Sequence, residues 1–521
     1  MGSDIDSPDW MTETLTHDLS HIAPQQILRT TVVYHPQWSR VGDWNDCYLP
    51  PITPSTPPPK PLIDIELSRQ HPSFQSATNG PARDLNDPYL SRRGVRLEFF
   101  VDGSLVIHRD DCPSPVLIDH KALQHSHKIA RHELQQGVVL MLAQRIVLHL
   151  QCIQAQQGPA ESLPRYGLVG NGHALNQVRA AIQRLAGLDL PVLIRGESGT
   201  GKELVARALH QSGPRHQQRF IAVNAAAIPA SLAAAEIFGA TKGAFTGSHQ
   251  NREGYLAQAH GGSLFLDEVG DLPAEVQTLL LRVLETHQYQ SLGSSEIKRF
   301  NARLIAATDV DLEAAMAEDR FRSSLYHRLS AMEIRLPALR EQRQNLGILL
   351  YHLLQQEAEQ LGVSQQCLAP RAPQQPSWFP AQWLYQLALA DWPGNIRQLR
   401  NFARQILLLG HHCTSIESEP QLHQLVKQVC QTQSNATAQA SSHTQHSQRV
   451  NSNSKAGALP ANNGARRLRD YSDDELLQIL VRLEWRLLKV ATELQVPRSS
   501  LYDRIQRSPL LKERLQQQRQ R

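Results

Sequence analysis

The chain has 521 residues, of which 41% are hydrophobic and 20% charged, and its formal net charge at pH 7 is +4. This length provides for roughly three to four domains, and no apolar run approaches the roughly 18 to 20 residues of a membrane-spanning helix. The small net charge disfavours polyanion binding over the whole surface, and the 6 cysteines, without a C-x-x-C pair, disfavour a disulfide framework or a zinc site.

The chain starts with MGSDIDSPDW, which is acidic and contains proline. No basic segment precedes an apolar stretch here, so we expect no secretory signal peptide and a cytoplasmic protein. Residues 1–27 are polar, and we expect them to form a disordered tail.

Residues 28–152 show the pattern of a domain built from β-strands. GVRLEFF, residues 94–100, alternates apolar with charged side chains, and an Asp-Gly pair joins it to SLVIH, residues 104–108, as a predicted hairpin. VVLMLAQRIVLHL, residues 138–150, predicts two further strands. The prolines of residues 49–61 predict a long loop or an edge region, because proline cannot donate a ladder hydrogen bond.

The next region alternates four short apolar runs, PVLIR, FIAVN, SLFLDE and RLIAAT, with helix-compatible segments. Such alternation predicts an α/β fold with a parallel sheet between helices. Further on, the chain becomes helical, then polar and almost free of large apolar residues, then helical again with an excess of basic residues. The predicted parts are an α/β subdomain at 162–340, a helical lid at 341–428, a flexible linker at 429–465 and an all-α DNA-contacting domain at 466–521.

A phosphate-binding loop is predicted at GESGTGKE, which places G-x-x-x-x-G-K between an apolar strand and the helical ELVARALH. Glycines let backbone N–H groups turn toward an anion, Lys202 reaches the outer phosphates, and the helix N-terminus adds its dipole. Glu203 stands where a hydroxyl residue normally helps to hold Mg²⁺, so Thr200 or a water would substitute. The candidate ATP-binding residues are Gly196, Glu197, Ser198, Gly199, Thr200, Gly201, Lys202 and Glu203.

Two carboxylates end the third apolar run, SLFLDE. Asp267 is suited to hold Mg²⁺, and Glu268 is suited to orient or deprotonate the water that attacks the γ-phosphate. Parallel strands would bring them to the same sheet edge as the phosphate loop. Asp309, after RLIAAT, could sense the γ-phosphate, and Asn224, after FIAVN, could hold Glu268 in an inactive orientation.

Three arginines complete the predicted site. Arg322 and Arg328, six residues apart in FRSSLYHRL, are either ordinary surface arginines or a supply of positive charge to the phosphates of a neighbouring subunit. Arg397, in DWPGNIRQLRN, is a candidate to reach back to the phosphates from the helical lid.

The octet GAFTGSHQ, residues 243–250, places Phe245 and Thr246 between two glycines, where no helical or strand period would bury the ring. Taken alone, the octet is compatible with a turn whose Phe folds back onto its own domain. An aromatic residue presented on a mobile loop is the alternative.

GESGTGKE, GAFTGS, GGSLFLDEVGDL, FRSSLYHRL and WPGNIRQLRN occur in this order, and together they closely resemble the AAA+ module of bacterial enhancer-binding proteins, the activators of sigma-54 RNA polymerase. The resemblance covers about residues 165–410. It implies a hexameric ATPase that uses Mg²⁺ and ATP to remodel the closed promoter complex, and in this family Glu after the loop lysine is usual. It also implies that a loop touches sigma-54 through Gly243, Ala244, Phe245, Thr246, Gly247 and Ser248.

The sequence departs from the family pattern at four positions. Ser248 stands in place of Ala, and Asp309 in place of Asn, which adds a negative charge near the expected γ-phosphate. Ser324 and Asn345 each stand in place of Asp. These departures bear on the rate of hydrolysis more than on the fold.

Both ends of the chain carry weaker resemblances. WRLLKVATELQVPRSSLYDRIQRS, residues 485–508, resembles a Fis-type helix-turn-helix, although a small helical hairpin is the alternative. IELSRQHPSF and DPYLSRRGVRL distantly resemble a forkhead-associated domain, a β-sandwich in which Arg69, Ser91 and Arg92 could grip a phosphothreonine. Gly94 replaces the usual His of that motif, so a structural or protein-docking sandwich is the alternative. The candidate DNA-binding residues are Arg498, Ser499, Ser500, Tyr502 and Arg504.

Three functions remain open from the sequence. The first is a sigma-54-dependent activator with a sensor, a ring ATPase and a DNA anchor. The second is an AAA+ remodeller of another protein target. The third is a DNA-bound scaffold that binds ATP with little hydrolysis, which Asp309 suggests.

Overall fold

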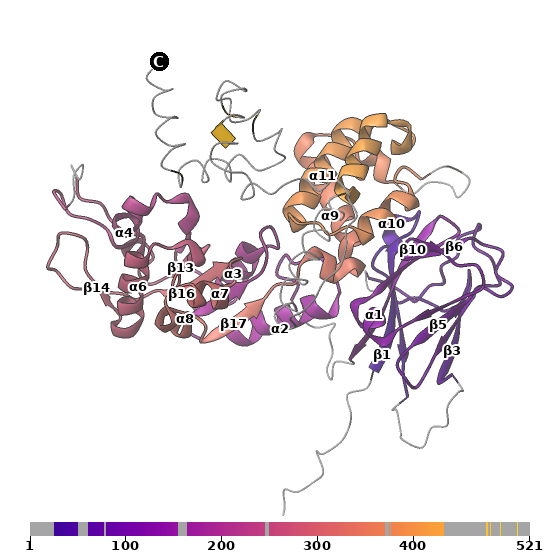
Figure 1. The fold of residues 1–521 in the computed structure, drawn as a ribbon, viewed down its shortest axis with the longest axis horizontal. Coiled ribbons are helices and arrows are strands. Elements are labelled where there is room, and N and C mark those ends of the chain that lie inside the picture. The colour runs from indigo at the N-terminus through magenta and orange to yellow at the C-terminus, as the bar shows by residue number, and fades with distance from the viewer. Residues whose placement is uncertain are drawn as a thin grey trace, which may run out of the picture. The chain divides into compact units, whose positions relative to one another are not determined.

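A computed structural model describes residues 26–50, 61–77, 80–154, 164–244, 250–369, 375 and 377–431, and further on only residues 476, 477, 480, 490 and 508. The chain divides into two compact units, residues 1–441 and 442–521. All helices and strands with stated bounds lie in the first unit (Figure 1). Residues 1–25 of the predicted tail, residues 432–465 of the predicted linker, the proline-rich 51–60 segment and most of the C-terminal domain lie outside the described residues. The predicted bounds were wrong at two places, because residues 26 and 27 belong to the first strand and residues 429–431 to a helix.

The N-terminal part is a sandwich of two antiparallel sheets, with the strand orders β2-β1-β10-β9-β6-β7 and β3-β4-β5-β8. Both predicted strand pairs are confirmed: β4 pairs with β5, and β9 pairs with β10. One short helix, α1 (Arg131–Gln136), precedes β9. The strands are β1 (Gln26–Tyr34), β2 (Trp44–Tyr48), β3 (Ile63–Leu67), β4 (Val95–Phe99), β5 (Leu105–His108), β6 (Val116–Ile118), β7 (Lys121–Ala122), β8 (Ser126–Ile129), β9 (Val138–Leu142) and β10 (Ile146–Gln154).

The core of the sandwich lies between its sheets. In β4, Val95, Leu97 and Phe99 are buried in this core, while the charged residues between them are half-exposed. The alternation in the sequence therefore matches the two faces of the strand. β9 is buried along its whole length, because Val139 and Met141 on its other face contribute to a second core that includes helical residues of the lid.

His149 makes the sandwich sensitive to acid. Its side chain is 1% exposed, and burial lowers its pKa to about 3. Because only the neutral ring is tolerated in the fold, its contribution to stability is complete above about pH 6.5 and is lost as the pH falls toward 3. Protonation should therefore lower the free energy of unfolding by about 1.4 kcal/mol for each pH unit below about 6.5.

Replacing His149 by Phe should flatten this pH dependence, since Phe keeps the ring and removes the titration. Denaturant unfolding of both proteins between pH 7 and pH 4.5 measures the effect. Equal slopes of unfolding free energy against pH in the two proteins would show that His149 does not titrate on unfolding.

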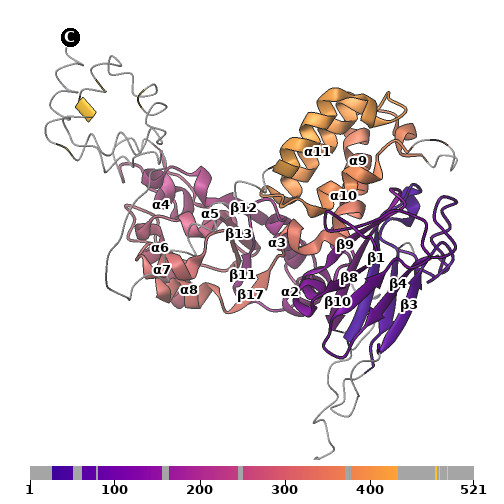
Figure 2. The same cartoon turned by 45° about the vertical axis from the view of Figure 1, so that its right-hand side comes forward.

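The central part contains a five-stranded parallel sheet in the order β12-β13-β16-β11-β17, with helices on both faces (Figure 2). The strands are β11 (Val192–Arg195), β12 (Phe220–Asn224), β13 (Ser263–Asp267), β16 (Arg303–Thr308) and β17 (Met332–Arg335). The helices are α2 (His173–Ala186), α3 (Lys202–Gln211), α4 (Ala230–Phe238), α5 (Tyr255–Gln258), α6 (Ala274–Thr286), α7 (Leu312–Ala317) and α8 (Ser323–Leu329), and a short hairpin of β14 (Gln288–Tyr289) and β15 (Lys298–Arg299) follows α6.

The middle strand β16 explains why the sequence shows a continuous apolar run instead of alternation. Leu304 and Ala306 are buried in one core, and Ile305 and Ala307 are buried in the core on the opposite face. A strand covered by helices on both faces has no polar side. The predicted α/β architecture is therefore present, and the carboxyl ends of its strands lie at one edge of the sheet.

The lid contains α9 (Leu346–Leu361), α10 (Ala381–Leu389) and α11 (Asn395–Gly410), and a further helix covers residues 420–431. Short 3₁₀ segments lie at Leu339–Asn345, Gln365–Leu368 and Ile416–Ser418. Trp383, Leu399 and Phe402 are buried where these helices pack together. No helix of the described part of the chain is long and apolar enough to span a bilayer.

Candidate functional site

The phosphate loop connects the end of β11 to the start of α3. Gly199 and Gly201 have φ angles of +80° and +99°, which glycine adopts without the strain that a side chain would cause. A Cβ on Gly199 would also overlap the carbonyl oxygen of Gly394 in the lid. These two positions therefore require glycine, and α3 begins directly after them at Lys202.

Lys202 is only 6% exposed and contacts both the loop and the acidic pair. Its Nζ donates to the Gly196 carbonyl oxygen at 3.0 Å and lies 3.2 Å from Glu268 Oε1. The ammonium group is thus held within the cradle of the loop, where the outer phosphates of a nucleotide would bind.

Asp267 and Glu268 lie at the carboxyl end of β13, next to Lys202. Asp267 Oδ1 accepts from the Glu268 N–H at 3.2 Å, and Glu268 Oε2 accepts from the Asp309 N–H at 3.1 Å. Burial raises the pKa of both carboxyls above the ordinary value, Lys202 opposes this shift, and the Asp309 carboxylate adds a smaller upward contribution. The raised pKa of Glu268 is appropriate for a general base.

Asn224 does not hold Glu268 in this structure, in contrast to our expectation. Its side-chain oxygen accepts from the Ala227 N–H at 3.3 Å and caps the 3₁₀ turn that follows β12. Short polar side chains readily satisfy a nearby backbone group in this way. Lys202 and the Asp309 backbone hold the Glu268 carboxylate instead.

Side-chain oxygens of Thr200 and Asp267 lie around the expected Mg²⁺ position. Thr200 Oγ1 donates to the Glu197 carbonyl oxygen at 2.7 Å, which leaves its lone pairs available. Glu203 is turned to solvent and pairs with Arg207 at 2.7 Å. Asp267 and Thr200 therefore fit a hard cation better than Glu203 does.

The lid contacts the phosphate loop directly through the start of α11. Arg397 donates to Ser198 Oγ at 3.0 Å. This position is consistent with the prediction that Arg397 reaches back from the lid toward the phosphates. The Ile396 N–H donates to the Gly199 carbonyl oxygen at 3.0 Å. Asn395, which is fully buried, donates to the Ser198 carbonyl oxygen at 3.0 Å and to Glu197 Oε2 at 3.1 Å.

Arg340 adds an ion pair between the lid and the loop. Its guanidinium donates to both carboxylate oxygens of Glu197, and this interaction holds the Glu197 pKa below its ordinary value. Asn395 also accepts from the Leu339 N–H at 2.8 Å, so it joins the loop to the segment that carries Arg340. Sequence reasoning missed Arg340 and Asn395. Nothing in the spacing of the sequence identifies the distant partners of either residue.

Arg322 and Arg328 lie on the surface, at the start and near the end of α8. The Arg322 N–H donates to the buried Gln277 side chain at 2.9 Å, and Arg328 lies 3.9 Å from Glu285 in an exposed pair. Within the described residues, neither guanidinium contacts the phosphate loop or the acidic pair of its own chain. Their position is compatible with ordinary surface arginines and with a supply of charge to a neighbouring subunit.

Two residues of the predicted sigma-54 contact, Gly243 and Ala244, are among the described residues. Gly243 has a φ of +83°, and the Ala244 N–H donates to the Thr241 carbonyl oxygen at 3.1 Å. The rest of the predicted sigma-54 contact and all of the predicted DNA-binding residues lie outside the described residues, namely Phe245, Thr246, Gly247, Ser248, Arg498, Ser499, Ser500, Tyr502 and Arg504.

The residues predicted to bind a phosphothreonine lie on neighbouring segments of the sandwich. The Arg69 N–H donates to the Ser91 carbonyl oxygen at 3.0 Å. Ser91 Oγ accepts from the Arg93 N–H at 3.0 Å, and Arg92 is exposed. The geometry thus brings Arg69 and Ser91 together at one end of the sandwich.

A parallel sheet with a glycine loop after β11, an acidic pair at the end of β13 and a helical lid that contacts the loop defines an AAA+ P-loop NTPase domain. Residues 168–335 match the family model of the sigma-54 interaction domain.

Similar proteins are found among transcriptional regulators. The DNA-binding transcriptional regulator NtrC of Salmonella typhimurium is 43% identical over 269 residues, which are 52% of this chain and 55% of NtrC. The transcriptional regulatory protein ZraR of Escherichia coli is 39% identical over 276 residues, 53% of this chain and 60% of ZraR. The chain thus spans little more than half the length of these relatives. A crystal structure of NtrX from Brucella abortus in complex with ADP is 28% identical, with a TM-score of 0.44, and covers 65% of this chain and 68% of NtrX.

Proposed function

We propose that this protein is a sigma-54-dependent transcriptional activator that binds DNA upstream of promoters and hydrolyses ATP to remodel the closed complex of sigma-54 RNA polymerase. The match of residues 168–335 to the sigma-54 interaction domain supports the assignment. The single structural observation that carries the ATPase part is the contact of Lys202 in the phosphate loop with Glu268 at the end of β13.

The residues of the site have distinct roles in this proposal. When ATP binds, its γ-phosphate competes with Glu268 for the Lys202 ammonium group, and the released carboxylate orients and deprotonates the attacking water. Asp267 and Thr200 would hold Mg²⁺, which neutralises charge on the phosphates when bound. Arg397, already at Ser198, links the bound nucleotide to the lid.

We propose that the active site is completed by a neighbouring subunit in a hexamer. Arg322 and Arg328 lie away from their own phosphate loop and are exposed, so they are available to a second copy. An arginine supplied in trans stabilises the charge of the phosphoryl-transfer transition state.

The remaining contacts are proposed from the sequence. Phe245 and Thr246 would touch sigma-54, the C-terminal helix-turn-helix would bind upstream DNA, and the sandwich would act as a forkhead-associated-like sensor. The proximity of Arg69 and Ser91 supports the last assignment.

Replacing Thr246 by Ala tests the assignment to sigma-54. We expect transcription from a sigma-54 promoter to fall to background, because the loop would no longer engage its target, while ATP hydrolysis is retained. Promoter output and phosphate release are measured on the same full-length protein. Thr278→Ala, an exposed position on α6, is the matched control and should leave both readings unchanged. Full promoter output from the Thr246 variant would reject the sigma-54 assignment and favour a remodeller of another protein.

One observation favours the alternative of an ATP-binding scaffold with little hydrolysis. The Asp309 carboxylate lies beside the acidic pair and adds to the negative charge there, which would oppose a γ-phosphate. Phosphate release from the purified protein distinguishes the two functions. The scaffold should release little phosphate, whereas the activator should hydrolyse ATP.

A further inference from the structure

The N-terminal sandwich and the lid share one apolar core. Trp38, in the loop after β1, is 6% exposed and stacks on Tyr351 of α9, with ring centroids 5.1 Å apart. The Tyr34 hydroxyl donates to the Phe379 carbonyl oxygen, and the Trp38 ring contacts the Phe379 ring edge-on. Val33 and Val41 of the sandwich lie in this core with leucines of α9. The lid side of the sandwich is therefore buried in the same way as a domain interior.

Backbone atoms also approach closely at this junction. A Cβ on Gly347 of α9 would overlap the carbonyl oxygen of Val33, and its three nearest neighbours would all belong to the sandwich. α9 therefore has a glycine where the sandwich strand β1 touches it. The close approach of β1 to α9 therefore leaves no room for a side chain at this position.

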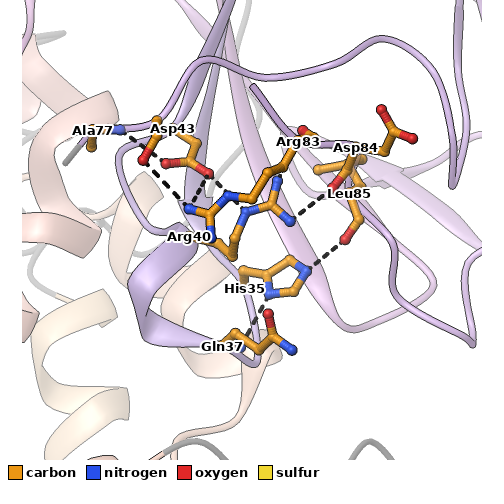
Figure 3. Close-up of polar contacts among 9 residues, drawn as sticks. His35, Gln37, Arg40, Asp43, Ala77, Arg83, Asp84 and Leu85 are labelled. Atoms are coloured by element: carbon orange, nitrogen blue, oxygen red, sulfur yellow. Dashed lines mark hydrogen bonds and ion pairs between the residues drawn. The ribbon is translucent and has the colours of Figure 1, made fainter. Parts of the chain in front are cut away.

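The loop that carries Trp38 is held in place by a buried polar network (Figure 3). Arg40 and Asp43 are 3% and 0% exposed and form an ion pair at 2.7 Å. Arg40 also donates to the Asp84 carbonyl oxygen at 2.7 Å, and Asp43 accepts from the Ala77 N–H at 3.0 Å. On the other side of Trp38, the His35 ring is hydrogen-bonded to the Leu85 carbonyl oxygen at 2.9 Å. Because these bonds anchor both ends of the loop to the sandwich, Trp38 is presented to the lid in a fixed position.

The sandwich also contacts the chain that enters the α/β subdomain. Arg165, before α2, donates to the Ala77 carbonyl oxygen at 3.4 Å. Asn345, directly before α9, accepts from the Asn171 N–H at 3.1 Å. The sandwich thus packs on α9, and α11, which packs against α9, reaches the phosphate loop through Asn395 and Arg397.

We infer that the lid-facing surface of the sandwich, formed by Val33, Tyr34, Trp38, Val41 and Gly42, is an intramolecular docking surface that holds the lid closed on the phosphate loop. The inference rests on the proposed nucleotide site. The sandwich acts on this site through α9 and the loop contacts of α11, without touching the nucleotide. Loss of docking frees the lid. Nucleotide binding then weakens, because the contacts of α11 with the phosphate loop are no longer stabilised by the sandwich.

Replacing Gly347 by Ala tests the docking surface, because the three atoms nearest to the new methyl group all belong to the sandwich, and alanine is a better helix former than glycine. In the full-length protein we expect faster amide hydrogen exchange in β1 and α9 and a dissociation constant for ADP at least threefold higher than in the wild type. Gly187→Ala is the matched control, because a Cβ at Gly187 meets nothing within 4 Å and its φ is −77°.

The outcomes separate the two proposals. If the wild type itself does not bind ADP, the proposed nucleotide site fails, and this inference fails with it. If the wild type binds ADP but Gly347→Ala leaves hydrogen exchange unchanged, the surface is not a close-fitting interface. Faster exchange with unchanged or tighter ADP binding would show that docking does not hold the lid closed.

A reversible cross-link provides a second test that does not depend on the folding of the Gly347 variant. A Cβ on Gly42 would lie 3.8 Å from the Cβ of Ile348, within the range of a disulfide. In a Gly42→Cys, Ile348→Cys double variant we expect the oxidised form to bind ADP at least as tightly as the reduced form. Comparison of the two states of one protein cancels the strain at Gly42. Weaker binding after oxidation, reversed by reductant, would contradict the inference.

Discussion

Replacing Glu268 by Gln should lower kcat for ATP hydrolysis at least about 100-fold, because the amide cannot accept the proton of the attacking water. ATP binding should persist, since Lys202 and the phosphate loop are intact. Gln is nearly isosteric with Glu and can still accept from the Asp309 N–H, which now holds the carboxylate at 3.1 Å. Phosphate release and a separate ATP titration on the same protein measure the two effects.

Glu318→Gln is the matched control for this experiment. Glu318 directly follows α7, and its carboxylate forms an exposed ion pair with Arg320 at 2.6 Å. The control should hydrolyse ATP at the wild-type rate. An unchanged rate in the Glu268 variant would show that Glu268 does not act as the general base of ATP hydrolysis.

Replacing Arg322 by Ala should also lower kcat at least about 100-fold, because the transition state would lose an arginine supplied by the neighbouring subunit. A mixture of Arg322→Ala with Glu268→Gln should recover part of the activity, although each variant alone is inactive. In mixed rings, a Glu268→Gln subunit still donates Arg322 to an Arg322→Ala subunit whose Glu268 is intact.

Arg320→Ala is the control for this mixture, because Arg320 is also exposed on the same segment and pairs locally with Glu318 at 2.6 Å. It should retain activity. An Arg322 variant as active as the control would leave Arg322 an ordinary surface residue. A mixture that recovers nothing would assign Arg322 to its own subunit's site.

The α/β fold could be predicted from the sequence because its inner strands are covered on both faces. RLIAAT reads as an uninterrupted apolar run, and the structure buries its alternate residues in two different cores. The edge strand β17 was not predicted. Its sequence MEIR buries Ile334 fully and leaves both charged residues exposed, so four residues with one buried side chain produce little signal.

The candidate site was predictable where a motif fixes the backbone. Lys202, Asp267 and Glu268 lie together because their strands are parallel and their loops share one sheet edge. The partner of a polar side chain was harder to predict: Asn224 was expected at Glu268, yet it caps its own turn. The contacts of Asn395 and Arg340 join residues about 140 to 200 positions apart, and only the packing of the lid brings them together.

Two of the departures from the family pattern, Asn345 and Asp309, have different roles in the structure. Asn345 is 2% exposed and its side chain joins the segment before α2 to Gln342, so it has a role in fixing the start of the lid. Asp309 is exposed and contributes its backbone N–H to Glu268. The first departure therefore concerns architecture, while the second bears on the charge of the site.

Phosphate release from the full-length protein as a function of protein concentration tests the central claim most directly. The account predicts ATP hydrolysis whose rate per subunit rises steeply as subunits assemble and which is absent from Glu268→Gln at every concentration. A rate per subunit that stays constant on dilution to monomers, or phosphate release no greater than that of the Glu268 variant, would contradict it.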